Sequence, residues 1–213
     1  MVLNPPSLDH RPSQEPHRGA ILLHGRNRPP GDMRDIAASL GMLDWRCVFP
    51  AVEGASWYPH PFASPIEENE PALGESVERI RLELERIEGE GLAAEKVLVG
   101  GFSQGACVVA EYLARGGSRP MAILLLSGAL PGPDDLVRPP RADLAGVPAF
   151  VTGSHADPYM PAARVAATAE WLRAGGAEVH LTLFEDRLHT IDESEIADAA
   201  SFIAGLERQD EET

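Results

Sequence analysis

The chain has 213 residues, of which 44% are hydrophobic and 24% charged, the balance of an ordinary soluble globular protein. Its formal net charge of −15 argues against a nucleic-acid-binding surface and against docking on anionic lipid. No apolar run approaches the length of a membrane span, and residues 1–17 lack the apolar core of a signal peptide. We therefore expect a single cytoplasmic domain over residues 18–206, with a partly ordered arm at 1–17 and a charged tail at 207–213.

The two cysteines, Cys47 and Cys107, fall on a predicted strand and a predicted helix. In these positions they are typical of buried thiols rather than of a disulfide. This cysteine usage favours a reducing compartment, in agreement with the expected cytoplasmic location.

Short apolar runs alternate with amphipathic helical patterns along the chain. Strands are predicted at residues 20–23, 46–49, 97–99, 121–126, 147–152 and 178–184. Helices are predicted at residues 29–40, 72–90, 161–174 and 191–206, and a further helix after residue 103. Long loops are expected at 51–71 and 127–145. Because most of these strands are apolar on both faces, the pattern predicts an α/β fold: a three-layer α/β/α sandwich around a mostly parallel sheet, without a large lid domain.

Residues 97–114 combine a β-branched apolar run, the motif Gly-x-Ser-x-Gly at 101–105 and a helical apolar pattern. Strand, sharp turn and helix form the context in which this motif becomes a nucleophile elbow. The turn crowds the backbone around Ser103, so Gly101 and Gly105 must be small. The helix that follows favours negative charge at its N-terminus. Ser103 is therefore the predicted nucleophile.

In sheets of this kind, ligands bind at the carboxyl ends of the parallel strands. Four predicted strand ends carry residues 24–26, Ser103, Asp157 and His189. A serine hydroxyl is a weak nucleophile until a base removes its proton, and histidine and aspartate supply that chemistry. The strand ends therefore predict one acyl-transfer site.

The base should be a histidine oriented by a carboxylate, in the chain order serine, acid, histidine. His189 follows the last strand and is the predicted general base and acid; the alternative is a helix-capping or merely exposed histidine. Asp157 follows the preceding strand and would accept a hydrogen bond from His189 and stabilise its imidazolium. Asp134, Asp135 and Asp143 are weaker candidates for the acid because they lie before that strand, whereas Asp186 or Asp192 could cap the last helix.

The tetrahedral intermediate of acyl transfer needs hydrogen-bond donors for its oxyanion. The backbone N–H groups of Gln104 and Arg26 are the predicted donors, so that Arg26 acts through its backbone rather than its charge. His24 is expected to be structural. The acidic run at 67–70 has no histidine at ligand spacing, so no metal site is expected there.

With these residues in place, the sequence resembles the phospholipase/carboxylesterase branch of the α/β-hydrolase superfamily, which includes acyl-protein thioesterases. Within that branch it is most similar to small bacterial esterases of the hydroquinone-resistance type. The matching motifs span about residues 20 to 205: Leu23-His24-Gly25-Arg26, Ser56-Trp57-Tyr58-Pro59, Phe62-Ala63-Ser64-Pro65, Asn69-Glu70-Pro71, Gly101-Phe102-Ser103-Gln104-Gly105-Ala106, Leu126-Ser127-Gly128, Asp157-Pro158-Tyr159-Met160-Pro161 and His189-Thr190-Ile191.

The resemblance implies a compact α/β-hydrolase fold and a serine esterase with the triad Ser103, Asp157 and His189. It also implies that no metal or organic cofactor is needed and that the protein is a homodimer, as members of the family often are. Trp57 and Phe62 would line or cover the acyl pocket; the alternative for each is ordinary packing under the long loop.

The sequence departs from the family pattern in two places. Residues 26–28, Arg-Asn-Arg, replace a glycine-bearing loop after the His-Gly pair, which predicts a differently shaped oxyanion loop. Arg187 and Leu188 precede His189 where a glycine is usual, which predicts a shifted histidine loop. Neither departure removes a catalytic group.

The leading hypothesis is hydrolysis of small to medium carboxylic esters through an acyl-Ser103 intermediate. A thioesterase or lysophospholipase would use the same residues on another leaving group, and pocket shape decides between these activities. A non-catalytic ligand-binding protein on the same fold is the alternative of a different class. Its weakness is that every triad residue is present.

Overall fold

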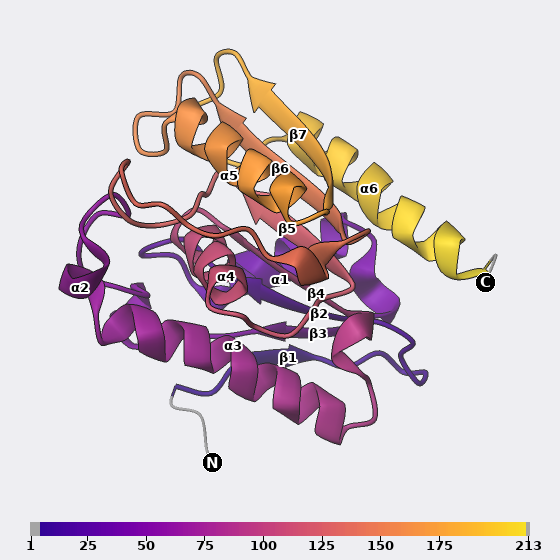
Figure 1. The fold of residues 1–213 in the computed structure, drawn as a ribbon. Coiled ribbons are helices and arrows are strands. Elements are labelled where there is room, and N and C mark those ends of the chain that lie inside the picture. The colour runs from indigo at the N-terminus through magenta and orange to yellow at the C-terminus, as the bar shows by residue number, and fades with distance from the viewer. Residues whose placement is uncertain (1–4, 212–213) are drawn as a thin grey trace.

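A seven-stranded sheet forms the centre of the computed structural model, which describes residues 5–211 (Figure 1). Residues 1–4 of the predicted arm and 212–213 of the predicted tail lie outside the described residues. The strand order is β1-β3-β2-β4-β5-β6-β7, and every neighbouring pair is parallel except β1 with β3. The strands are β1 Leu8–His10, β2 Gly19–Leu23, β3 Arg46–Phe49, β4 Val97–Phe102, β5 Ala122–Leu126, β6 Pro148–Ser154 and β7 Glu178–Phe184.

Helices cover both faces of this sheet. The α-helices are α1 Pro30–Ser39, α2 Ile66–Asn69, α3 Ala72–Gly89, α4 Gln104–Ala114, α5 Ala162–Ala174 and α6 Glu193–Glu211. One apolar core lies between the sheet and α3, α4 and α5, and a second lies between the sheet and α1 and α6. Figure 1 views the sheet from the side of α3, α4 and α5. The predicted three-layer α/β/α sandwich with a mostly parallel sheet is confirmed.

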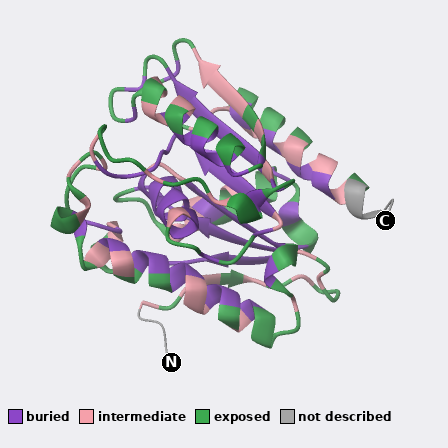
Figure 2. Ribbon diagram, viewed as in Figure 1, coloured by how far each residue is buried: buried purple, intermediate pink, exposed green. Residues whose placement is uncertain are grey.

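The two cores explain why the central strands are apolar at consecutive positions. In β2, Ile21 and Leu23 belong to the core under α3 and α4, whereas Ala20 and Leu22 belong to the core under α1 and α6. All four side chains are 0% exposed, because successive residues of a strand point to opposite faces. Figure 2 shows the buried strands between helices whose outer faces are exposed.

The structure adds an element that the sequence analysis did not predict. Within the arm expected at residues 1–17, β1 pairs antiparallel with β3 at the edge of the sheet. Buried Arg46 of β3 binds Asp9 of β1 (Nη2–Oδ2, 3.2 Å) and Glu90 beyond α3 (Nε–Oε2, 2.8 Å). These ion pairs hold β1 against the sheet. A strand of three residues is too short to be detected from hydrophobic periodicity.

Several segments differ from their predicted extent, among them β4 and β6, which extend to Phe102 and Ser154. The loop expected at 51–71 contains a turn of 3₁₀ helix, Glu53–Ala55, and the short helix α2. The last helix begins at Glu193 and continues to Glu211, past its predicted end at residue 206.

The segment between β7 and α6 carries His189, and a buried polar cluster fastens it. Arg187 is 8% exposed and donates hydrogen bonds to the carboxylate of Glu195 and to Ser127 Oγ, the latter at 3.1 Å. Thr152 at the end of β6 also donates to Glu195, which is 0% exposed. Burial raises the pKa of Glu195, against the hydrogen bond from Thr152 and the attraction of Arg187. The cluster therefore joins the histidine segment to α6 and to the sheet.

The N-terminus of α6 is capped by a side chain. Asp192 Oδ1 accepts a hydrogen bond from the backbone N–H of Glu195 at 3.0 Å, and this bond lowers the pKa of Asp192. Asp192 is one of the carboxylates that the sequence analysis proposed as a cap for the last helix. Such a cap typically stabilises a helix by about 1 kcal/mol, so it fixes the direction in which α6 leaves the histidine segment.

Removing the guanidinium of Arg187 should destabilise the fold strongly. In Arg187→Met, the Glu195 carboxylate stays buried without its cation, which typically costs about 3–5 kcal/mol. The measurement is the free energy of unfolding in urea, followed by circular dichroism.

A matched control is Arg173→Met, which breaks the exposed pair with Glu170 and should cost about 1 kcal/mol or less. The double variant Arg187→Met, Glu195→Leu removes both buried charges and should recover most of the lost stability. A loss in Arg187→Met no larger than that in the control would contradict the role assigned to the pair.

Candidate active site

Ser103 lies on a sharp turn between β4 and α4. Its backbone has φ 55° and ψ −122°, a region that a non-glycine residue enters only when the surrounding structure forces it. A Cβ on Gly105 would lie 2.3 Å from the carbonyl oxygen of Leu23, and a Cβ on Gly101 would lie 2.7 Å from the carbonyl carbon of Gly105. Both positions must therefore be glycine, which gives the Gly-x-Ser-x-Gly motif a steric explanation.

Ser103, His189 and Asp157 form one line of hydrogen bonds. Ser103 Oγ lies 2.7 Å from His189 Nε2, and His189 Nδ1 lies 2.6 Å from Asp157 Oδ2. The three residues are 32 or more positions apart in the sequence and come from three different strand ends. The structure thus brings together the three side chains that the sequence analysis selected. The bond to Asp157 leaves Nε2 as the nitrogen that faces the serine.

Asp157 is itself held in place. The carboxylate oxygen that does not face His189, Oδ1, accepts backbone N–H bonds from Tyr159 at 2.8 Å and Met160 at 3.0 Å. Its side chain is buried. A carboxylate with these donors cannot rotate freely, so it fixes the tautomer and the plane of the imidazole ring.

Two aromatic rings enclose the imidazole of His189. The ring of Phe102 lies 5.1 Å from it, centroid to centroid, and the ring of Tyr159 lies 5.3 Å from it in an edge contact. These contacts restrict the imidazole to the orientation in which it bridges Ser103 and Asp157.

The two predicted oxyanion donors belong to backbone segments that meet at the elbow. Gln104 is the first residue of α4, a position whose backbone N–H has no acceptor within the helix. Arg26 follows β2, whose end passes directly over Gly105. The arrangement of these two backbone segments agrees with an oxyanion hole, although the roles of both residues stay predictions.

The side chains of Arg26 and Gln104 have a function that the sequence analysis missed. Arg26 Nη2 donates to the carbonyl oxygens of Tyr58 and His60, both at 2.9 Å. Gln104 Oε1 accepts from the N–H of Trp57 at 3.0 Å, and Nε2 donates to the carbonyl of Tyr58 at 2.7 Å. Both side chains therefore anchor the 51–71 loop to the elbow. These contacts join residues more than 30 positions apart, so the sequence carried no local signal for them.

A cavity of about 520 Å³ opens beside the serine. Phe62 lines it, and so does the thiol-bearing residue Cys107 of α4; that Phe62 contacts an acyl group stays a prediction. Burial raises the pKa of Cys107, so this thiol stays protonated and unreactive. The full lining is Arg26, Asn27, Tyr58, Pro61, Phe62, Ser103, Gln104, Cys107, Tyr159, Met160 and His189.

Trp57 is not among the residues that line this cavity. Its side chain is 1% exposed and packs against the ring of His24 at 4.7 Å, and its Nε1 donates to the carbonyl oxygen of His24 at 2.7 Å. The expected position of Trp57 at the acyl pocket is therefore corrected to packing under the loop. The indole needs a hydrogen-bond acceptor when buried, and the end of β2 supplies one.

His24 takes part in this packing rather than in the serine's hydrogen bonds. Its Nδ1 donates to the carbonyl oxygen of Gly25 at 2.8 Å, and burial lowers the pKa of the imidazole. A neutral, hydrogen-bonded histidine at this position supports the loop that carries Arg26.

Within the described part of the chain, no group of three or more histidine, cysteine or carboxylate side chains is arranged to hold a metal ion. None of the described helices combines the length and apolar character that crossing a membrane requires.

Comparison with known proteins places this site in a family. The family model for phospholipases and carboxylesterases matches residues 51–206, which include all three residues of the hydrogen-bonded line. No curated protein matches the sequence.

Several solved structures have the same fold. A phospholipase/carboxylesterase from Dyadobacter fermentans is 28% identical, with a TM-score of 0.86 over 93% of this chain and 95% of that one. A carboxylesterase from Mesorhizobium loti is 21% identical, with a TM-score of 0.76 over 96% of this chain and 98% of that one. The carboxylesterase of Bacillus cereus is 17% identical, with a TM-score of 0.77 over 94% of both chains. The last two likenesses concern the fold alone.

The family match covers most of the chain, and the predicted resemblance is confirmed. It makes the protein an ester hydrolase of the serine type. The chain belongs to the phospholipase/carboxylesterase family of α/β hydrolases.

Proposed function

We propose that the protein is a serine carboxylesterase that hydrolyses small to medium carboxylic esters through an acyl-Ser103 intermediate. The observation that carries the proposal is the line of hydrogen bonds from Ser103 through His189 to Asp157, at 2.7 and 2.6 Å, beside a cavity of about 520 Å³. In a phospholipase/carboxylesterase, such a line supplies nucleophile, base and orienting acid.

Acylation begins when Ser103 Oγ attacks the ester carbonyl carbon and His189 Nε2 takes the hydroxyl proton. The carbonyl oxygen becomes an oxyanion that accepts hydrogen bonds from the backbone N–H groups of Arg26 and Gln104. Asp157 stabilises the imidazolium that forms. The bond from the carbonyl carbon to the leaving oxygen then breaks, and His189 Nε2 donates its proton to the departing alcohol.

Deacylation repeats these steps with water. His189 Nε2 removes a proton from a water molecule as its oxygen attacks the acyl carbon, and the same two N–H groups bind the second oxyanion. The bond to Ser103 Oγ breaks, the proton returns to the serine, and the carboxylic acid leaves. Every proton passes through one nitrogen, so the reaction needs no group beyond these residues and water.

The cavity supports short and medium acyl groups. Its lining includes Phe62 and other residues of the 51–71 loop, Met160, and residues of α4. A thioesterase or lysophospholipase would use the same residues, so the preferred leaving group has to be determined by comparing substrates.

Two further parts of the proposal concern the setting of the enzyme. We propose that the enzyme is located in the cytoplasm, because Cys47 and Cys107 are both free, buried thiols. Burial raises the pKa of Cys47 to about 12. The homodimer implied by the family resemblance is likewise part of the proposal.

Replacing the nucleophile should abolish hydrolysis of every ester. The parent protein and Ser103→Ala would be compared on p-nitrophenyl esters from acetate to laurate, with a loss in kcat of roughly 10⁴-fold or more expected for the variant. Ser201→Ala, an exposed serine of α6, is the matched control and should keep the parent rate.

The same series measures the acyl preference. The parent rate should peak at short or medium chains, because each buried CH₂ contributes about 0.8 kcal/mol only while the cavity has room for it. A rate that rises steadily beyond about ten carbons would contradict this preference, and turnover of acyl thioesters alone would favour the thioesterase.

Changing the orienting acid should lower kcat and leave KM nearly unchanged. Asp157→Asn keeps the shape of the side chain but no longer stabilises the imidazolium or fixes its tautomer, which costs about 10⁴-fold in kcat in enzymes of this type. Steady-state kinetics on p-nitrophenyl butyrate would measure both constants. Asp198→Asn, an exposed carboxylate of α6, is the control. An Asp157→Asn variant as active as this control would exclude the triad.

A further inference from the structure

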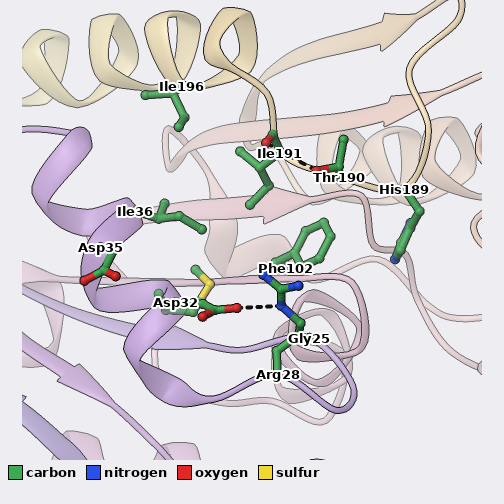
Figure 3. A pocket seen from close by; sticks show the side chains of 11 residues that line it. Gly25, Arg28, Asp32, Asp35, Ile36, Phe102, His189, Thr190, Ile191 and Ile196 are labelled. Carbon is green, nitrogen blue, oxygen red and sulfur yellow. Dashed lines mark hydrogen bonds and ion pairs between the residues drawn. The ribbon is translucent and has the colours of Figure 1, made fainter.

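A second cavity lies beside His189, next to the one that contains Ser103. It has a volume of about 310 Å³, and its walls come from α1, the end of β4, the segment before α6, and α6 itself. Figure 3 shows Phe102, Ile36 and Ile191 around this space, with His189 at one side. The full lining is Gly25, Arg28, Asp32, Met33, Asp35, Ile36, Phe102, His189, Thr190, Ile191 and Ile196.

The lining of this cavity is mixed, and its apolar part consists of side chains at the edge of the core. Ile36, Phe102, Ile191 and Ile196 are partly buried and pack against the cluster between the sheet, α1 and α6. Each therefore keeps apolar surface exposed in the cavity. Covering that surface with an apolar group is favourable, at about 25 cal/mol per Å² of area removed from water.

His189 is the residue that both cavities share. The first cavity also contains Ser103 and Gln104, whereas the second contains neither. In the proposed reaction, His189 Nε2 has to reach the leaving oxygen to protonate it. The alcohol half of the ester must therefore lie against the imidazole, while the acyl half extends from the carbonyl carbon in another direction.

We propose that the second cavity binds the alcohol half of the ester, and that this half is an uncharged apolar alcohol, aromatic or branched. The proposal rests on the proposed esterase function and deepens it. The first cavity then holds the acyl half near Ser103, and His189 stands between the two halves of the substrate.

The charges around the second cavity define the class of alcohol. Arg28 Nε lies 2.5 Å from Asp32 Oδ2, and Asp35 Oδ1 lies 3.0 Å from Arg34 Nη2. Both carboxylates of the lining are thus paired, and the one guanidinium of the lining is held by Asp32. A phosphate or carboxylate on the alcohol would have to compete with Asp32 for Arg28 and would approach two aspartates. An uncharged alcohol meets no such cost.

The test narrows the second cavity and compares two esters of one acid. Ile36→Trp replaces a branched aliphatic side chain on the α1 wall of the cavity by a bulkier indole ring. We expect the ratio of kcat/KM for benzyl butyrate to that for methyl butyrate to fall by roughly tenfold or more, because a filled pocket rejects a large group by about this factor. Ala38→Trp, at an exposed position of the same helix, is the matched control and should keep the parent ratio.

Each other outcome has a defined meaning. An unchanged ratio in Ile36→Trp, with both esters hydrolysed, would overturn the alcohol site and leave the esterase standing. A changed dependence on acyl length at a constant ratio would assign the cavity to the acyl chain and overturn the proposal. Equal rates of the parent protein on benzyl and 4-carboxybenzyl butyrate would overturn the class of alcohol. Failure of the parent protein to hydrolyse any ester would overturn the proposed function, and the alcohol site with it.

Discussion

The close approach of the end of β2 to the turn at Ser103 is the constraint on which the rest of the site depends. A Cβ at Gly105 would overlap the carbonyl oxygens of Leu23 and His24, at 2.3 and 2.6 Å. The backbone after β2 therefore lies directly over the start of α4. One packing contact thus places Ser103, the first N–H of the helix and the loop that carries Arg26 within one small volume. In a site that stabilises developing charge, this fixed geometry avoids reorganisation during the reaction.

The segment that carries His189, on the other side of the site, is held by a different kind of interaction. The elbow is positioned by backbone contact, but the segment that carries His189 is fastened by the buried charges of Arg187 and Glu195, together with Thr152. A buried ion pair adds little net stability, yet losing one partner is costly, so it selects one arrangement over its alternatives. The 2.7 Å hydrogen bond between Ser103 Oγ and His189 Nε2 joins these two parts of the site. Backbone contacts position the serine, and a buried ion pair positions the histidine.

Most of the fold and the three central residues were predictable because they follow local rules. The strands Arg46–Phe49 and Glu178–Phe184 have the bounds that their sequence pattern predicted, and chain order selected Asp157 and His189. The misses depend on long-range contacts. Periodicity cannot detect a three-residue strand held by ion pairs, and the long loop gave no sign that the Trp57 side chain turns inward. Arg187 was noticed only as a departure from glycine. The burial of its partner Glu195 could have been predicted. Glu195 is spaced four and eight residues before Ala199 and Ile203, on the buried face of α6.

The cluster around Glu195 also sets an order of assembly. The turn at Ser103, the loop after β2 and Asp157 all precede residue 158, so they are synthesised before the segment that carries His189. His189 and its anchor on α6 come last in the chain. Ser103 takes its histidine partner from a segment that the contact of Arg187 with Glu195 fastens to α6. The hydrogen-bonded line is therefore completed only by residues that are synthesised after the other parts of the site.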